Sequence, residues 1–462
     1  MFAELIGLLA RELPVDRLAE FLNADASRRS PALRLAALLA ARRVAPRDET
    51  LAGLGLADRD PRVRQAAVQW VAEEKLSDLR GAVEQVFQSK DVTSGLFVAS
   101  LAALAMLDGQ NPAEIDKLPA SQYVVPLATD AQRPASVRVQ ALRLVSPTDP
   151  SLTPEFFDSL WSTSDKSLQV EALRSWQGRK TSEIADRLLK LPQDASVDRS
   201  LRLESILALS DQAAREEAGG PARTLLARLL QDKDPQISIE ALRALRGVNQ
   251  PDDGLQRALS QLAGQISATT GEPTDAIREQ AAQIALLADL WKLTPFAKLK
   301  PFLEPRPTTK EEWVYALGRG RGGDPEAGRR AFFHPAGAGC LKCHTIQGRG
   351  GRVGPDLSRA PDTMNRMQMV LSLLEPSAEI APQFVAWTME LRDGRQHTGM
   401  IVHENEGKTV LGDAEGKTVT LPTADIVERI PQKTSVMPAQ LYDRMTLQEV
   451  RDVLAYLVKG SR

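Results

Sequence analysis

A short helical pattern recurs through the first two thirds of the chain. In its clearest copy, residues 60–67 (Asp-Pro-Arg-Val-Arg-Gln-Ala-Ala), the Asp supplies a helix N-cap and the next Pro suits the first turn. Val63 and Ala67, four residues apart, then share one face of the helix. The pattern returns at residues 234–241, and weaker copies pair an apolar residue with a small one: Leu33 with Ala37, Val137 with Ala141, Leu168 with Ala172, Leu201 with Ser205, and Ile277 with Ala281. Copies spaced by roughly thirty to forty residues predict a solenoid of helix pairs.

These units resemble HEAT repeats, whose second helix often begins Asp-Pro-x-Val-Arg-x-x-Ala. The resemblance covers residues 1–291 and is clearest at residues 58–76 and 232–247. It implies that small residues let neighbouring helices approach closely. Arginines at similar positions are expected to pair with carboxylates between repeats, which is an architectural role: Arg64, Arg138, Arg174, Arg243 and Arg278.

The repeat pattern stops at a segment that is rich in proline and glycine. Residues 292–323 contain four prolines and end in the run Gly-Arg-Gly-Arg-Gly-Gly at residues 318–323. Such a composition predicts a linker, here with one short helix at residues 311–317, and a domain boundary.

Residues 324–462 are expected to form a second domain that begins and ends with helices. Asp324 before a proline predicts a helix through Phe333, and helix signals return at residues 363–374. The last helix is expected at residues 446–458, opened by a Thr with a Glu three residues later.

The middle of this domain has a different texture. Between residues 384 and 430 the sequence alternates apolar and polar residues and is interrupted by Asp-Gly and Glu-Gly turns. This pattern predicts a small β-rich insertion with short strands at residues 385–391, 398–402, 409–411 and 418–421.

Composition excludes several classes of protein. The formal net charge is −2, whereas a general nucleic-acid binder carries a basic excess. No stretch approaches the roughly 18–20 uninterrupted apolar residues that a membrane span needs. The chain has two cysteines, both in one motif, which excludes a disulfide framework and a four-cysteine zinc site.

Residues 340–344 (Cys-Leu-Lys-Cys-His) form a CxxCH motif, the attachment signature of a c-type haem. Two thiols add across the two vinyl groups of one haem, so they must lie about a helical turn apart. A redox dithiol would instead follow a strand in a βαβ unit, whereas a short helix and a Gly-rich loop precede this motif. We therefore predict one covalent haem bound through Cys340 and Cys343, with His344 as the proximal iron ligand.

The segments around the motif resemble class I cytochrome c. Residues 328–332 (Gly-Arg-Arg-Ala-Phe) match the family's first helix, and Tyr456 matches the aromatic of its last helix. The resemblance implies that these helices cross near the glycine and pack their aromatics beside the haem. Residues 354–357 (Gly-Pro-Asp-Leu) match a further family segment. That match implies that the Pro355 carbonyl accepts the Nδ1 proton of His344 and fixes the tautomer of the ring.

Residues 435–438 (Ser-Val-Met-Pro) supply the best candidate for the second axial ligand, Met437. A thioether is a soft ligand, and His/Met ligation raises the reduction potential. The following proline stiffens the loop, and the family resemblance points to the same residue. Three other methionines at helical spacing are expected to pack in the core or at the haem edge: Met364, Met367 and Met369.

Ligation by two histidines would need a second histidine besides His344. The remaining ones are expected to be structural or at the surface: His334, His397 and His403.

The order of segments in residues 324–460 resembles the haem-binding C-terminal domains of large planctomycete-type and verrucomicrobial proteins. In that group the haem domain commonly follows HEAT repeats, which follow a β-propeller similar to a sugar or membrane-bound dehydrogenase. No propeller pattern is seen in this sequence. The matching segments are residues 354–357, 374–377, 391–394 with Gly399, 435–438 and 454–457.

The expected fold is therefore mainly α: a HEAT-like α-solenoid followed by a class I cytochrome c-like helical domain with a small β-rich insertion. The predicted function is electron transfer from a dehydrogenase to a respiratory acceptor, with the repeats docking a redox partner. With both axial sites filled, the iron is closed to substrate, and no catalytic residue is assigned. Any membrane association would come through partners.

Two alternative functions remain open. The chain could be the electron-accepting C-terminal part of a haem-containing dehydrogenase of the sugar or alcohol type, whose catalytic propeller lies elsewhere. It could also be a scaffold in which the haem is structural.

The family resemblance also predicts a cellular location. Covalent haem attachment takes place outside the bacterial cytoplasm, so we expect a periplasmic or otherwise extracytoplasmic protein. Residues 1–14 have an acidic residue inside a short apolar run and no basic leader, which is not typical of a signal peptide. We therefore expect the given N-terminus to be incomplete or artificial.

Overall fold

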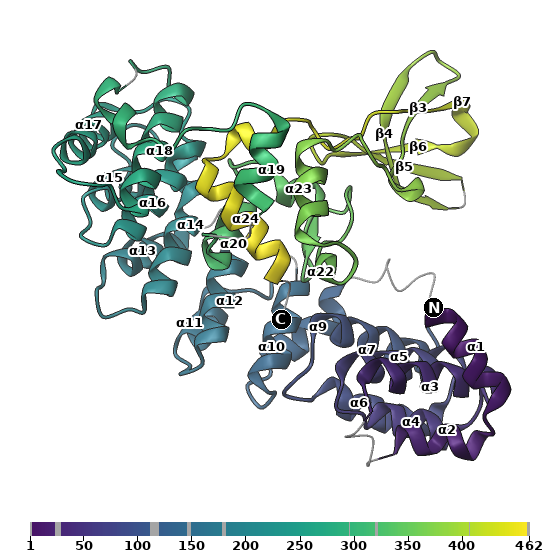
Figure 1. The fold of residues 1–462 in the computed structure, drawn as a ribbon. Helices are drawn as coiled ribbons and strands as arrows, with labels where there is room; N and C mark the ends of the chain where they lie inside the picture. The colour runs from purple at the N-terminus through teal and green to yellow at the C-terminus, as the bar shows by residue number, and fades with distance from the viewer. Residues whose placement is uncertain are drawn as a thin grey trace. The chain divides into compact units, whose positions relative to one another are not determined.

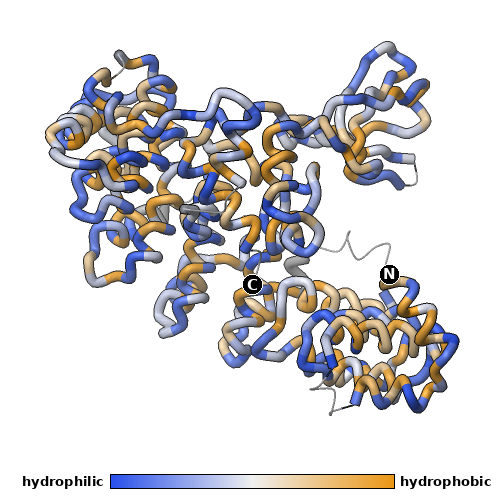
Figure 2. Tube along the Cα trace, in the orientation of Figure 1, coloured by the Kyte–Doolittle hydropathy of each residue, from blue (hydrophilic) through white to orange (hydrophobic). Residues whose placement is uncertain are grey.

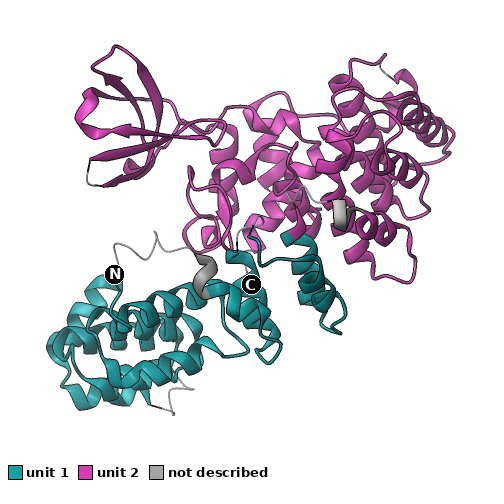
Figure 3. Cartoon of the chain, turned by 180° about the vertical axis from the view of Figure 1, so that it is seen from behind, with its two compact units in different colours: residues 1–175 teal, residues 176–462 magenta. Residues whose placement is uncertain are grey.

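The computed structural model shows a mainly helical chain with a small antiparallel sheet near its C-terminus (Figure 1). It describes residues 2–23, 29–110, 120–145, 149–177, 182–294, 296–318, 322–405 and 407–459. The chain divides into two compact units, residues 1–175 and 176–462 (Figure 3). The second unit therefore contains later helical repeats together with the CxxCH motif.

The first unit is a stack of helices in two layers. One layer runs through α1, α3, α5 and α7, each packed on the next, and α2, α4 and α6 cover it. In Figure 2 most of these helices carry both hydrophobic and hydrophilic residues, as amphipathic helices do, whereas α7 has no charged residue. The bounds are α1 (Phe2–Glu12), α2 (Val15–Leu22), α3 (Pro31–Val44), α4 (Glu49–Leu56), α5 (Pro61–Glu73), α6 (Arg80–Phe87), α7 (Ser94–Leu107), α9 (Ala120–Thr129), α10 (Ala135–Leu144), α11 (Pro154–Trp161) and α12 (Lys166–Trp176), with a 3-10 turn η2 (Ser77–Leu79).

The second unit opens with a similar stack. The helices α14, α16 and α18 pack on one another in sequence, and α13, α15 and α17 form the other layer. The bounds are α13 (Ser182–Lys190), α14 (Arg199–Arg215), α15 (Pro221–Leu229), α16 (Pro235–Ala244), α17 (Asp253–Ser267) and α18 (Asp275–Leu290), with 3-10 turns η3 (Leu191–Gln193), η4 (Leu245–Gly247) and η5 (Ala297–Phe302).

The Asp-Pro pairs begin helices as predicted. The side chains of Asp60, Asp234 and Asp324 each accept a hydrogen bond from a backbone N–H of the first turn, and a proline follows each of them. These caps fix the starts of α5, α16 and α20.

The rest of the second unit holds a smaller group of helices. Their bounds are α19 (Lys310–Gly318), α20 (Pro325–Phe332), α21 (Cys340–Cys343), α22 (Ala360–Thr363), α23 (Arg366–Leu374) and α24 (Leu447–Lys459), with 3-10 turns η6 (Pro382–Phe384), η7 (Thr423–Asp425) and η8 (Leu441–Arg444). The contacting helices α20 and α24 lie between the helical stack and α23 (Figure 1). The helices α19, α20, α23 and α24 share one hydrophobic core, which includes Trp313, Phe332, Val370, Val450 and Leu454.

The sheet near the C-terminus has five strands in the order β6-β5-β4-β3-β7, all antiparallel. Its small core is made by Met389, Leu391, Leu411 and Leu421. A separate two-stranded ribbon pairs Thr345 with Gly350. The bounds are β1 (Thr345–Ile346), β2 (Arg349–Gly350), β3 (Ala386–Leu391), β4 (Gln396–Asn405), β5 (Lys408–Gly412), β6 (Thr418–Pro422) and β7 (Ile426–Pro431).

Most helical and sheet predictions for residues 292–462 agree with these elements, but the helix predicted at residues 363–374 begins only at Arg366 as α23, and Thr363 ends the separate turn α22. Four predicted strands correspond to β3, β4, β5 and β6, and the helix expected in the linker is α19. The strand β7 and the ribbon β1–β2 were not predicted. In the part of the chain that the structure describes, no helix is long and apolar enough to cross a membrane.

Candidate haem site

The CxxCH motif forms a single helical turn, α21. Gly339 precedes it in the left-handed conformation, with φ of 88°, which a residue with a side chain adopts only under strain. The helical turn places Cys340 and Cys343 three residues apart on one side, and both thiols are free. His344 ends the helix and is half-buried.

The loop after the ribbon β1–β2 wraps back over this helical turn. The N–H of Gly351 donates to the Leu341 carbonyl at 2.7 Å, and the N–H of Gly354 donates to the Cys343 carbonyl at 2.7 Å. The loop is thus hydrogen-bonded to the backbone of the motif, and these bonds fix its position beside His344.

The imidazole of His344 is oriented by this loop. Its Nδ1 lies 3.0 Å from the Pro355 carbonyl oxygen, the contact that the family resemblance implies. Because a carbonyl only accepts, Nδ1 carries the proton, and Nε2 is the ring nitrogen with a lone pair. A Cβ on Gly354 would lie 2.8 Å from His344 Cε1, so only glycine lets the loop pass this close to the ring.

The helices that flank the motif cross at a glycine. A Cβ on Gly328 of α20 would lie 1.9 Å from the carbonyl oxygen of Asp452 in α24, so the two backbones are in direct contact there. One turn further along, the rings of Phe332 and Tyr456 meet edge to face with centroids 6.0 Å apart. The crossing and the aromatic pair are thus as the resemblance to class I cytochrome c implies.

Met437 lies in the segment between β7 and η8 and is half-buried. Its N–H donates to Ser435 Oγ at 3.1 Å, and the Ser435 N–H donates to Ser377 Oγ at 3.1 Å. These bonds tie the predicted ligand loop to the segment after α23. Among the described contacts, none joins Met437 to His344, so its role as the second axial ligand stays a prediction.

The other methionines lie nearer the core of this group of helices. Met369 is buried in it, Met364 packs against it, and Met367 is 37% exposed. The predicted core role is therefore confirmed for Met369 and Met364.

His334 is fully buried and serves the loop that leads to the motif. Its Nδ1 accepts a hydrogen bond from the Ala336 N–H at 3.1 Å, so the proton is on Nε2. Burial lowers the pKa of His334 to about 3, and the charges of Arg246 and Arg243 contribute to this shift, so the ring is neutral. His397 is half-buried and His403 is exposed, both in β4.

The thiols are held in their neutral form. Burial raises the pKa of Cys340 to about 11. Burial also raises the pKa of Cys343, and the carboxylates of Asp413 and Glu415 add to this effect. A nucleophilic dithiol needs the opposite shift, toward the thiolate.

The residues present fit a c-type haem. They offer two unpaired thiols one helical turn apart and an adjacent imidazole whose Nδ1 proton is fixed by Pro355. If a haem is attached, Cys340 and Cys343 would form its thioether links and His344 Nε2 would bind the iron. In the described residues, no cluster of three or more His, Cys, Asp or Glu side chains offers a different metal site.

A buried charge cluster joins the motif's helices to the helical stack, and the sequence reasoning missed it. In it Arg330 of α20 binds Glu240 of α16 at 2.8 Å, and Arg329 binds Glu204 of α14. The members are Glu204, Glu240, Arg243, Arg246 and Glu279 from the stack, and Arg329, Arg330 and Glu449 from α20 and α24.

Glu449 is the centre of this cluster. Its two oxygens accept from Arg243 Nε and Arg246 Nη2, both at 2.6 Å. Burial alone would raise the pKa of Glu449, but the two guanidinium groups outweigh it and hold that pKa well below its usual range.

Burial raises the pKa of Glu279, and the nearby Glu449 charge adds to this shift. Arg243, predicted to pair between repeats, thus pairs with α24.

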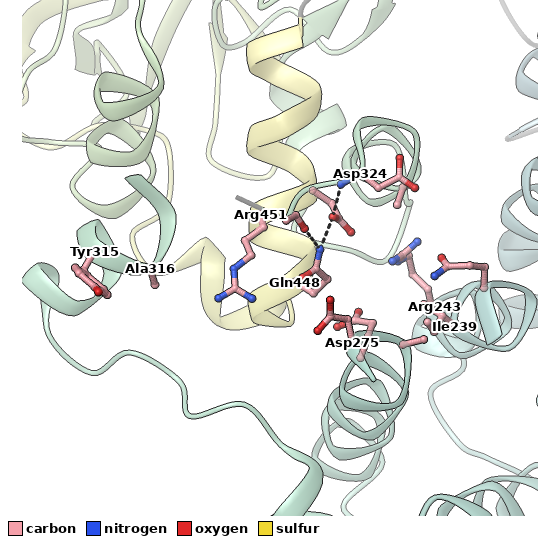
Figure 4. Close-up of a pocket in the computed structure, with 14 residues that line it drawn as sticks. Ile239, Arg243, Asp275, Tyr315, Ala316, Asp324, Gln448 and Arg451 are labelled. Atoms are coloured by element: carbon pink, nitrogen blue, oxygen red, sulfur yellow. Dashed lines mark hydrogen bonds between the residues drawn. The ribbon is translucent and has the colours of Figure 1, made fainter. Parts of the chain in front are cut away.

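A cavity of about 440 Å³ opens where α16 and α18 meet α19, α20 and α24. Figure 4 shows Arg243 and Asp275 on its stack side and Gln448 on the side of α24. Asp452 accepts there from Gln448 Nε2 and from the Asp324 N–H, both at 2.8 Å. The cavity belongs to this seam, since the CxxCH residues do not line it.

Comparison with known proteins adds no relative. No protein-family model matches the chain, and no curated protein matches it.

Proposed function

We propose that this chain is an electron-transfer protein of the class I cytochrome c type, carried on HEAT-like helical repeats. Cys340 and Cys343 hold one c-type haem, and His344 and Met437 are its axial ligands. When bound, the haem supplies a one-electron couple, and the polypeptide sets its ligands and surroundings.

The observation that carries this proposal is the hydrogen bond between His344 Nδ1 and the Pro355 carbonyl, at 3.0 Å. It fixes the ring in the tautomer that presents Nε2 to a metal and makes that nitrogen more basic. A histidine with only a packing role would need neither a hydrogen bond from Nδ1 to a carbonyl nor a glycine, Gly354, in contact with its ring.

The crossing of α20 and α24 supports the same conclusion. Gly328 and Phe332 precede the CxxCH motif in the sequence, and Tyr456 follows it. The glycine contact and the edge-to-face ring pair therefore join segments from both sides of the motif. In class I cytochromes, equivalent first and last helices close around the haem. The proposed electron donor is a dehydrogenase and the acceptor a respiratory protein, in an extracytoplasmic compartment.

Axial ligation is the sharpest test of this function. The full chain, exported with its haem attached, would be compared with Met437→Ala and with Met364→Ala as a matched loss of a methionine near the core. We expect Met437→Ala to lose the weak far-red band of a ferric haem with a sulfur ligand, and its ferrous form to bind carbon monoxide. The wild type and Met364→Ala should keep the band and resist carbon monoxide. Survival of the band in Met437→Ala would rule out this ligand.

A redox titration tests electron transfer itself. The wild type should show one reversible one-electron transition, with a lower potential in Met437→Ala because the thioether stabilises the ferrous state. An irreversible or absent transition would leave a structural haem as the better explanation.

A further inference from the structure

The turn between β5 and β6, residues 413–417, lies directly against the CxxCH helix. Gly416 in this turn has φ of 76°, and a Cβ there would be 2.4 Å from the Lys342 carbonyl oxygen. The loop that follows β2 contacts the same oxygen, because a Cβ on Gly351 would be only 1.8 Å from it. The carbonyl of Lys342, between the two cysteines, is thus in contact with two glycines from different segments.

The same sheet also touches the loop that orients His344. A Cβ on Gly412, the last residue of β5, would lie 2.5 Å from Cγ2 of Val353. Val353 is only 1% exposed and directly precedes Gly354, which packs on the His344 ring. The sheet therefore meets both the helix that carries the thiols and the loop that holds the imidazole.

The 413–417 turn has a fixed shape, and its two acidic residues and one lysine give it a net charge of −1. Asp413 Oδ1 accepts from the N–H groups of Glu415 at 3.0 Å and Lys417 at 2.8 Å, which closes the turn on its own carboxylate. Asp413 and Glu415 stand in the same turn as Gly416, which lies against the Lys342 carbonyl, so both carboxylates are carried on the segment next to the CxxCH helix.

We propose that the 413–417 turn is a built part of the candidate haem site: Gly416 braces α21, and Asp413 and Glu415 place negative charge beside that helix. The β-rich insertion then positions the attachment helix and lowers the reduction potential of the group held there. Negative charge next to the haem stabilises the ferric, more positive state. This inference rests on the proposed function for its redox consequence, but not for the brace.

The brace is tested in the full chain without haem. In a Cys340→Ser background, Cys343 is the single thiol, and its rate of reaction with a thiol reagent reports how firmly α21 is held. Gly416→Ala should speed this reaction by about tenfold or more, because the new methyl displaces the turn from α21 and increases local opening. Gly394→Ala is the matched control, since Gly394 has φ of 81° in another turn of the same sheet and an added Cβ meets nothing within 4 Å.

The control should carry the same backbone strain but change the thiol rate by less than about twofold. Equal rates in the two glycine variants would overturn the brace.

The charge effect is tested in the haem-loaded chain by redox titration. Asp413→Asn combined with Glu415→Gln should raise the reduction potential, whereas Glu428→Gln in β7, at the opposite edge of the sheet, should leave it unchanged. An unchanged potential in the double variant would overturn the electrostatic role. If the chain takes up no haem, the proposed function fails, while the thiol rates still decide whether the turn braces α21.

Discussion

Asp452 illustrates at the residue scale how a structural contact sets a charge. It is 4% exposed in α24, and its carboxylate accepts from Gln448 and from the Asp324 N–H. Burial raises the pKa of Asp452 from 3.8 to about 6. The native state therefore binds this proton more tightly than the unfolded chain does. The resulting stabilisation is complete below pH 3.8 and is lost as the pH rises through about 6.

Asp452→Asn should remove this pH dependence. The amide oxygen can still accept the two hydrogen bonds, so the variant should unfold like the wild type near pH 4 and be more stable by about 3 kcal/mol near pH 8. Denaturant unfolding of the full chain at both pH values measures the gap. Asp393→Asn, at an exposed turn where Arg395 holds the pKa below its usual value, should not become more stable at high pH. A gap for Asp452→Asn that shrinks with rising pH would contradict the assignment.

In the candidate haem site, one contact between single residues agrees with what the sequence resemblance implied. The resemblance of the CxxCH and Gly-Pro-Asp-Leu segments to class I cytochrome c implied that the Pro355 carbonyl meets His344 Nδ1, and the structure places the two atoms 3.0 Å apart. Gly416 and Val353 were missed. Gly416 matters because its lack of a side chain lets the turn lie against Lys342, and Val353 because its buried side chain contacts Gly412. The spacing of residues in the sequence reveals neither contact.

At the scale of elements, the contact between α20 and α24 depends on one missing side chain. Gly328→Ala would place a methyl carbon 1.9 Å from the Asp452 carbonyl oxygen, far inside van der Waals contact, so the two helices must separate. We expect a loss of about 3 kcal/mol or more in the free energy of unfolding, at the upper end of overpacking changes.

Gly264→Ala is the control for this change. Gly264 lies inside α17, and an added Cβ there meets nothing within 4 Å. It should stabilise the chain by about 0.5–1 kcal/mol, because alanine loses less entropy in a helix. Equal melting temperatures for the two variants would show that the crossing is not close-packed.

Helices and strands with clear end signals were predictable, and an edge strand was not. Asp-Pro caps and the pair Thr446 and Glu449 fixed helix starts, and the Glu449 N–H does donate to Thr446 Oγ1 at 3.1 Å. The strand β7 (Ile426–Pro431) is almost wholly exposed and ends in proline, so it lacks the alternation that marks a half-buried strand. The strand β7 is held in the sheet by its pairing with β3, which its own sequence pattern does not indicate.

At the scale of the whole chain, the buried charge cluster makes the haem-type helices and the stack α14, α16 and α18 one unit. Its ion pairs join residues 125, 90, 206 and 203 positions apart. Such pairs leave no local sequence signal, and this is why the repeats and the predicted haem domain looked separable in the sequence. The two compact units divide after residue 175.

Glu449→Gln tests this connection. It leaves Arg243 and Arg246 buried without their shared anion, so unfolding of the second unit should become easier by about 3–5 kcal/mol. The exposed pair of Arg429 and Glu404 provides the control, and Glu404→Gln should cost less than about 1 kcal/mol. Limited proteolysis of the full chain should cut Glu449→Gln between the stack and α19 much faster than the wild type. Equal resistance would contradict a joined unit.

The central claim is that Cys340 and Cys343 carry a haem covalently, and intact-mass measurement tests it most directly. The chain would be exported from cells that attach c-type haem, extracted with acidified acetone and weighed beside Cys340→Ser/Cys343→Ser. We predict that the wild type gains the mass of one haem that survives extraction, and that the double variant gains none. A wild-type chain with its unmodified mass after this treatment would contradict the proposed function.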